Sequence, residues 1–470
     1  MVTRIRIRTA YLLACMYCAC AAYRPAPLNP AEAAQRFDQR SLKNSDLCKY
    51  LESNPSVTGS SCPPEKWSLA SLTMVAFFYN PEIRVAQAKL DAARAAIVTA
   101  AARPNPSIGL GPAYTASEAP SFAPWAIGAV EINFPIETAG RRGYRIAKAE
   151  HLADATALGV AQVTWQIRSA VRASLVSHVA AEREYELARA YESTSARIVT
   201  LLQERVDAGE SSAPELNLAL ANLSAARVKA SQAQSRVMAT LGALAASVGV
   251  PVEVLTGTVI SWPGFDRPAK ETSLTPEYIQ QLALLNRVDL RRMLAQYAAA
   301  DEALKLEIAR QYPNINLGGG YSWEVNENIF ELVPVITLPL MNQNQGPIAE
   351  AEAKRAQLAA EFAALQDRVI AQAQGALTSF RGALRAFHQS SNAADFSEKR
   401  LREIQRAAEL NDIDALALVT AGLQTIAAQQ LRSRALESAQ MDLGSLEDAI
   451  ERPLGNENLK SITLPNHSGT

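Results

Sequence analysis

Residues 138–208 read TAGRRGYRIAKAEHLADATALGVAQVTWQIRSAVRASLVSHVAAEREYELARAYESTSARIVTLLQERVDA. This stretch has no proline and no cluster of turn residues, and its apolar side chains recur at the three- and four-residue spacing of one helix face. At about 1.5 Å per residue, a single helix here is roughly 100 Å long. No compact core is that long, so the helix must pack along others in a bundle, coiled coil or tube. The stripe consists of Val160, Val163, Ile167, Val171 and Leu175.

Two stretches with a period of two precede this helix. Apolar residues alternate with small or polar ones from Ile108 to Tyr114 and from Val130 to Phe134, on either side of a polar loop. The pattern predicts a β-hairpin with one apolar face and with strands at about residues 107–116 and 126–136. Such lengths suit outer-membrane strands, which need about 9–11 residues.

The second half of the chain repeats this order of elements. Pro313–Leu317 (PNINL) matches Pro106–Leu110 (PSIGL) about 207 residues later. A second hairpin is predicted at about residues 314–323 and 329–339, followed by a second long helix over residues 347–410.

The predicted fold is therefore mainly α-helical with a transmembrane β part. Each of the two repeats gives a helix, a β-hairpin, a very long helix and a return helix, the last ending near Val248 and Ile450. The predicted domains are a signal peptide (1–20), an N-terminal tether or wrapping segment (21–66), the first repeat (67–250), an inter-repeat linker (251–273), the second repeat (274–452) and a disordered tail (453–470).

The N-terminus is typical of an exported lipoprotein. Three arginines precede the apolar run Ala10–Ala19, which is too short to span a membrane. A cysteine at the end of such a run resembles a bacterial lipoprotein cleavage site, whose thiol is acylated. Cys20 gives the usual signal length and is preferred, whereas Cys15 follows the better local sequence. Cleavage without a lipid is the remaining alternative.

Cys48 and Cys62 remain after processing of the signal. In an oxidising compartment a pair this close in sequence favours a disulfide with a structural role. Two free surface thiols are the alternative.

Composition argues against several classes of function. The net charge is −1 and the charged fraction is 20%, so no general attraction to nucleic acid is expected. No phosphate-binding loop or nucleophile motif is present, so we expect no enzyme and no cofactor. The histidines lack metal-ligand spacing, so no metal site is expected; they are His151, His178, His388 and His467.

Four strands cannot close a membrane barrel, because the smallest have about eight. An open edge in lipid would leave backbone groups without hydrogen-bond partners. Oligomerisation must therefore close the sheet, and three copies give a 12-stranded β-barrel above an α-helical barrel.

Several short motifs, spread over nearly the whole mature chain, resemble those of a known protein family. They are Asn80–Ile83 (NPEI), Arg103–Pro106 (RPNP), Phe134–Arg142 (FPIETAGRR) and Leu338–Gly346 (LPLMNQNQG). With the repeat, they resemble the TolC family of outer-membrane efflux proteins, and the last two resemble most its CzcC-type branch, which is associated with heavy-metal efflux.

The resemblance implies a TolC-like channel-tunnel in the outer membrane of a Gram-negative bacterium, lipid-anchored and with a long periplasmic extension. The implied partners are two further copies in a homotrimer, a periplasmic membrane-fusion adaptor, an inner-membrane pump of the RND type and outer-membrane lipid. The implied function is a passive conduit for solutes, either heavy-metal cations or drugs. A periplasmic adaptor or a structural coiled-coil lipoprotein is the alternative, because it too would have long alanine-rich helices.

Two turns between long helices carry the candidate site residues. In the resembled family these turns form the periplasmic mouth, so Asp207, Glu210, Asp412 and Asp414 are candidates for an acidic gate. A solvated turn is the alternative, because Ala417, Leu418 and Thr420 stand where some members carry aspartates. The expected adaptor contacts in the same turns are Gly209, Ser211, Asn411 and Ile413, although helix capping explains these residue types equally well.

Arg141 and Arg142 are unusual at the start of a long helix, where the helix dipole disfavours positive charge. Contact with lipid phosphate would explain them, and a solvated helix face is the alternative.

Overall fold

The computed structural model describes residues 23–54, 62–114, 125–269, 274–324, 327–410 and 413–454. The chain divides into two compact units, Met1–Ser41 and Leu42–Thr470. Within the described part of the first unit, helix α2 (Pro30–Asp38) begins after Asn29, whose side chain accepts a hydrogen bond from the Ala31 amide. The second unit holds the elements that the repeat predicts.

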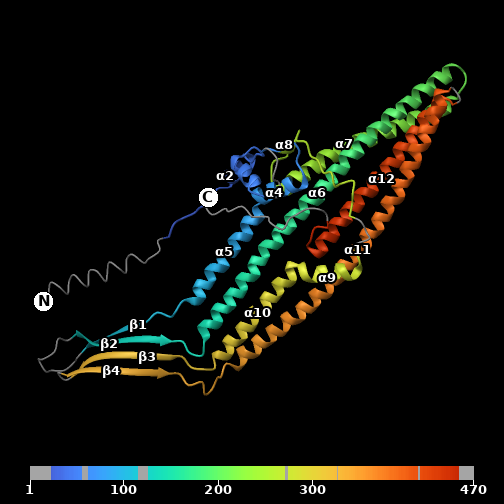
Figure 1. The fold of residues 1–470 in the computed structure, drawn as a ribbon. Coiled ribbons are helices and arrows are strands. Elements are labelled where there is room, and N and C mark those ends of the chain that lie inside the picture. Colours follow the sequence, from blue (N-terminus) through green and yellow to red (C-terminus); the bar gives the residue numbers. More distant parts are fainter. Residues whose placement is uncertain are drawn as a thin grey trace. The chain divides into compact units, whose positions relative to one another are not determined.

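In the second unit, the strands lie side by side at one end and the long helices extend away from them (Figure 1). The described strands form one antiparallel sheet in the order β1-β2-β3-β4. Each hairpin pairs its own strands, and β2 pairs with β3, which joins the two repeats in one sheet. The strands are β1 (Ser107–Tyr114), β2 (Trp125–Ile136), β3 (Ile315–Glu324) and β4 (Glu327–Ile336).

Two helices run along most of the second unit. They are α6 (Arg141–Asp207) and α11 (Gln345–Glu409), with 67 and 65 residues. Each is followed by a return helix packed along it, α7 (Ala213–Val248) after α6 and α12 (Ala415–Ile450) after α11. Because α6 also contacts α12, the two repeats form one continuous helical layer.

Shorter helices pack beside the long ones between their midpoint and the sheet. In the first repeat, α4 (Leu69–Tyr79) and α5 (Pro81–Ala101) are separated at Asn80, whose side chain caps α5 by accepting from the Glu82 amide at 2.9 Å. The second repeat has α9 (Pro276–Asn286) and α10 (Val288–Ala309) in the corresponding places. None of the described helices is both long and apolar enough to cross a membrane.

The N-terminal part of the second unit is folded onto the first repeat. Helix α3 (Ser45–Glu52) contacts α4, and a disulfide joins Cys48 to Cys62. The inter-repeat linker contains the short helix α8 (Val252–Leu255), and its Ile260 pairs with Trp67 in an isolated β-bridge. The segment that follows Ser41 thus packs as part of the first repeat's core rather than as a free tether.

The hydrophobic core is thick near the middle of the second unit and thin toward the far turns. Ile167, Val171 and Leu175 of the predicted α6 stripe are buried there. Farther along, α6 and α7 meet mainly through alanines, Ala188 against Ala230 and Ala233. Small side chains let these helices pack closely, but each contact buries little apolar surface.

The observed strands differ from the predicted ones by two residues or more at the end of β1 and at both ends of β4, which begins at Glu327 instead of 329. The described part of β1 ends at Tyr114, and residues 115–124 lie outside the described ranges. β4 ends at Ile336 instead of 339. The reason is local: Pro339 has no amide hydrogen, and the Leu340 amide turns back to the Leu338 carbonyl at 2.9 Å.

Candidate functional site

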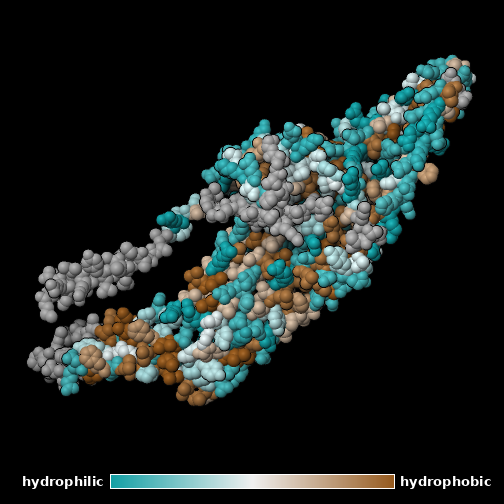
Figure 2. Space-filling model, viewed as in Figure 1, coloured by the Kyte–Doolittle hydropathy of each residue, from teal (hydrophilic) through white to brown (hydrophobic). Residues whose placement is uncertain are grey.

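One face of the sheet is apolar. Directly paired residues of an antiparallel sheet point to the same face, so the register assigns each side chain to a face. Hydrophobic residues lie over the sheet and where it meets the helices (Figure 2). The apolar face carries Ile108, Leu110, Val130, Ile132, Phe134, Ile136, Ile315, Leu317, Gly319, Tyr321, Phe330, Leu332, Pro334 and Ile336.

The opposite face, called here the polar face, has mainly small and polar residues. Its apolar exceptions include Pro135 of β2 and, on β4, Ile329, Val333 and Val335. Glu131 of β2 pairs with Gly320 of β3, which in turn pairs with Glu331 of β4. The two carboxylates therefore share one cross-strand row, two strands apart. Neither carboxylate is among the predicted site residues, although their spacing of about 200 residues is close to the repeat period of the chain.

The two outer strands of the described sheet, β1 and β4, each have a neighbour on one side only. Such edges leave a row of backbone donors and acceptors without a sheet partner. A second copy of the chain could pair with either edge.

Three arginines at the start of α6 join the helices to the sheet. Arg141 donates to the carbonyls of Ala309, Arg310 and Tyr312 and to the Asn314 side chain, all near the end of α10. The carbonyls at the C-terminal end of α10 lack partners within the helix, so they are free to accept from the guanidinium. Burial and the nearby Arg310 charge lower the pKa of Arg141. These contacts within the chain were not among the sequence interpretations of this residue, which were lipid phosphate and a solvated face.

Arg142 and Arg145 make the same kind of contact with the first repeat. Arg142 donates to the Ala101 carbonyl at 2.7 Å, and Arg145 donates to the carbonyls of Ala100 and Ala102 at the end of α5. Arg145 also pairs with Glu137 and lowers the pKa of that carboxyl. The start of α6 thus holds the ends of both α5 and α10, where the chain enters the sheet.

The turns at the far end hold the predicted gate and adaptor residues. Gly209 has φ +77°, the left-handed conformation expected after a helix end. Ser211 donates to Glu215, which also caps the Ser212 amide. Asp207 accepts from Gln203 at 2.8 Å, and Glu210 is exposed.

The second turn is only partly described, because Asn411 and Asp412 lie outside the described residues. Ile413 is half-buried, and Asp414 forms an ion pair with Arg205 at 2.6 Å. The charge of this gate candidate is therefore offset by an arginine from the last turn of α6, a common place for a basic residue. This ion pair is not predictable from local sequence, because its two residues belong to different repeats.

A buried polar network joins α6 to α12 near the middle of the helical layer. Arg168 and Arg172 both contact the carboxylate of Glu447, and all three side chains are less than 6% exposed. Arg172 also donates to the carbonyl of Gln440 at 2.8 Å. This network was also missed, although two arginines one turn apart beside an apolar stripe are a detectable signal.

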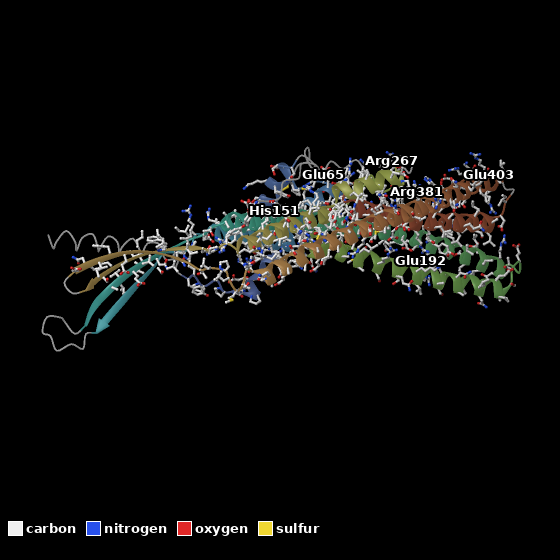
Figure 3. All side chains as sticks on the ribbon, turned by 90° about the horizontal axis from the view of Figure 1, so that it is seen from below. Glu65, His151, Glu192, Arg267, Arg381 and Glu403 are labelled. Atoms are coloured by element: carbon white, nitrogen blue, oxygen red, sulfur yellow. A yellow bond between two sulfur atoms is a disulfide. The ribbon has the colours of Figure 1, made fainter. Side chains whose placement is uncertain are left out.

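No group of three or more potential metal ligands was found among the described residues. His178 is buried, its Nδ1 lies 3.3 Å from the Thr240 hydroxyl, and burial lowers its pKa. His151 belongs to α6, and in Figure 3 it lies apart from the labelled Arg381 of α11. His467 lies outside the described residues.

The sequence of the first repeat matches a known family. Residues 77–250 match the family model described as outer membrane efflux protein. The chain is 26% identical over 277 residues to the cobalt-zinc-cadmium resistance protein CzcC of Cupriavidus metallidurans. That match covers 58% of this chain and 63% of CzcC, so the chain spans less than two thirds of this relative.

Solved structures share the fold over most of the chain. The outer membrane protein VceC of Vibrio cholerae matches with a TM-score of 0.64 and 17% identity, over 82% of this chain and 97% of VceC. CusC matches with a TM-score of 0.64 and 16% identity, over 81% of this chain and 91% of CusC. The fold is thus that of TolC-like channel-tunnels, and within it residues 77–250 are similar in sequence to the outer membrane efflux protein family.

Proposed function

We propose that three copies of the chain form an outer-membrane channel-tunnel, which serves as the passive exit conduit of a tripartite efflux system. The observation that carries this proposal is the sheet, which combines one apolar face with two unpaired edges at the end of a long helical layer.

Closure of the sheet requires more than one copy. Strand lengths of 8 to 12 residues match the span of a lipid bilayer. In lipid, the free edges β1 and β4 would cost several kcal/mol for each unsatisfied backbone group. Pairing β4 of one copy with β1 of the next removes all edges, and three copies form a closed sheet of twelve strands.

The helices then continue the pore away from the membrane. α6 and α11 are each about 100 Å long at 1.5 Å per residue. Six such helices from three copies, with their return helices, would enclose a tube that reaches across the periplasm. The far turns with Gly209, Ser211 and Ile413 would meet a periplasmic adaptor and, through it, an RND-type pump.

A lipid on Cys20, or on Cys15, would add an anchor to the outer membrane. Both cysteines lie outside the described residues. The family match supports an outer-membrane location for the folded part of the chain.

The transported solute is proposed to be a heavy-metal cation. The name of CzcC specifies cobalt, zinc and cadmium resistance. On the polar face, Glu131 and Glu331 would give six carboxylates at one level of a trimer, and a negative lining raises the local concentration of cations. The alternative function, a periplasmic adaptor or structural coiled-coil lipoprotein, is less well supported, because the fold is similar to those of solved outer-membrane channels.

The test is planar-bilayer conductance of the purified full-length protein, with its mass in detergent determined alongside. Trimers with discrete conductance steps are expected. A monomer that never conducts would remove the channel proposal. Glu131→Gln with Glu331→Gln should reduce cation preference without changing trimer mass, and an unchanged reversal potential would exclude these carboxylates from the conduction path.

A further inference from the structure

The segment between β4 and α11 exposes large apolar side chains outside the sheet. Leu338, Leu340 and Met341 are 66%, 78% and 99% exposed. We call residues 337–344 the second connector. It contains no charged residue.

The sequence of the second connector continues the apolar alternation of β4. On β4 the apolar face of the sheet is formed by every second residue from Phe330 to Ile336. Leu338 and Leu340 extend the same alternation by two further positions. Lipid or protein that covers the apolar face of β4 would therefore also lie beside the connector.

Backbone groups of the connector find partners within the chain. The Leu340 amide donates to the Leu338 carbonyl, and the Asn344 amide donates to the Asn342 side chain at 2.8 Å. The Gln343 amide donates to the Gln345 side chain. A segment that enters a water-poor environment needs such internal partners.

The other end of the connector is fixed to the helical layer. The Asn344 side chain donates to the carbonyl and the carboxylate of Glu307 near the end of α10, at 2.8 and 3.0 Å. This contact holds the polar end of the connector against the helices, while the apolar end follows β4.

The corresponding segment of the first repeat is different. Residues 137–140 (ETAG) include no apolar side chain larger than alanine. Glu137 pairs with Arg145, and Thr138 donates to the Pro313 carbonyl at 2.6 Å. The first connector is thus bound to neighbouring protein, whereas the second presents its side chains outward.

A second copy of the chain offers a poor partner for these side chains. If β4 pairs with β1 of the next copy, the segment nearest the connector is Ala102–Pro106, which directly precedes β1. That segment (ARPNP) is exposed, with a charged and an amide side chain among its five residues. It provides no large apolar side chain to match two leucines and a methionine.

We infer that the second connector inserts into the periplasmic leaflet of the outer membrane. Leu338, Leu340 and Met341 lie at the boundary between phospholipid headgroups and acyl chains, a depth typical of interfacial segments. The inference rests on the proposed function, because it requires the sheet to span a membrane.

The test uses single cysteines labelled with a fluorophore, in the full-length protein reconstituted in phosphatidylethanolamine–phosphatidylglycerol vesicles. Met341→Cys probes the connector, and Leu332→Cys probes the middle of β4 on the apolar face. Ser211→Cys, in the far turn, is the control for a position away from lipid. The parent protein gives the background from its own cysteines.

Quenchers are carried by lipids with a doxyl group at carbon 5, near the headgroups, or at carbon 12. The label at 341 should lose more fluorescence with the shallow quencher, the label at 332 more with the deep one, and the label at 211 none with either. Quenching at 332 but not at 341 would overturn the inference and leave the proposed function standing. Quenching at neither position would remove both. Iodide serves as a quencher in the water. If neither the lipid quenchers nor iodide quench the label at 341, the connector contacts a second copy instead of lipid, and the inference is wrong.

Discussion

The Arg205 guanidinium and the Asp414 carboxylate lie 2.6 Å apart and join the end of α6 to the residue before α12. The pair ties together the two turns that the sequence predicts at the periplasmic mouth. An apolar cluster under the turns, with Leu202 and Leu216 as buried members, supports the same contact. The two far turns of one copy are therefore held together by charge and packing between the two repeats.

Opposite changes in ion selectivity are expected from the two partners of this pair. Arg205→Ala leaves Asp414 unpaired, so cation preference should increase, and Asp414→Ala leaves Arg205 unpaired, so it should decrease. The stability change should stay within about 1 kcal/mol, because the pair is partly exposed. The measurement is the reversal potential across a salt gradient at low ionic strength, where charge is least screened. Shifts in the same direction, or none, would show that the pair does not face the conduction path.

A lysine substitution on β4 should impair membrane assembly when it lies on the apolar face but not when it lies on the opposite face. Leu332 lies on the apolar face and its neighbour Val333 on the opposite face. Leu332→Lys should lower assembly in the membrane, since lysine on a lipid-facing strand costs about 2–4 kcal/mol at the bilayer centre. Val333→Lys is the matched control and should assemble normally. The yield of heat-resistant trimer from outer membranes measures both, and equal yields would contradict the assignment of faces.

The long helices, the hairpins and the repeat were predictable because periodicity reports which side of a local element is buried. Ile167, Val171 and Leu175 are buried as their spacing requires. The similarity of residues 77–250 to an efflux protein family was also predictable, because the motifs lie at the ends of these elements.

Contacts between the repeats were not predictable from local patterns. Arg141 was read against the dipole of its own helix, whereas its partners belong to α10, more than 160 residues away. The sequence predicts Asp414 as a candidate for the acidic gate but does not predict its partner Arg205, for the same reason. A pattern within one element says which face is buried, but it does not say which distant carbonyl or charge meets that face.

Replacement of Arg141 should weaken the junction between helices and sheet. Arg141→Met removes the donors to the Ala309 and Arg310 carbonyls and to Asn314. A loss of roughly 2–4 kcal/mol is expected, because one hydrogen bond to a charged group contributes about 1.5–3 kcal/mol and neighbouring bonds do not add fully. The measurement is the urea midpoint of the detergent-solubilised protein. Arg103→Met, at an exposed arginine just before β1, is the control and should leave the midpoint unchanged.

Acid should remove the contribution of the Glu137–Arg145 pair. The hydrogen bond from Arg145 lowers the pKa of Glu137 in the folded state. The stabilisation is therefore present in full above the unfolded value, about 4.3 for glutamate, and is lost as the pH falls through the lower folded value. Glu137→Gln should be less stable than the natural protein at pH 7, and the difference should shrink below about pH 4. A difference independent of pH would exclude the ion pair as its cause.

Gly444 of α12 is required by the buried arginine that crosses from α6. A Cβ at position 444 would overlap Nη1 of Arg172, which donates to the Gln440 carbonyl at 2.8 Å and is held on its other side by Glu447. Arg172 has no exposed space into which to move, because its side chain is 5% exposed. Gly444→Ala should therefore destabilise the protein by about 1–3 kcal/mol, the usual cost of overpacking.

The matched control lies on the same helix. Gly422 of α12 has no atom within 4 Å of the position of an added Cβ. Gly422→Ala should be neutral or stabilising by up to about 1 kcal/mol, because alanine favours the helix over glycine. Thermal unfolding of both variants in detergent separates the effect of the arginine from that of helix propensity. Because α12 meets α6 at this point, loss of the Gly444 contact should also reduce the coupling between the repeats, seen as faster hydrogen exchange in both helices.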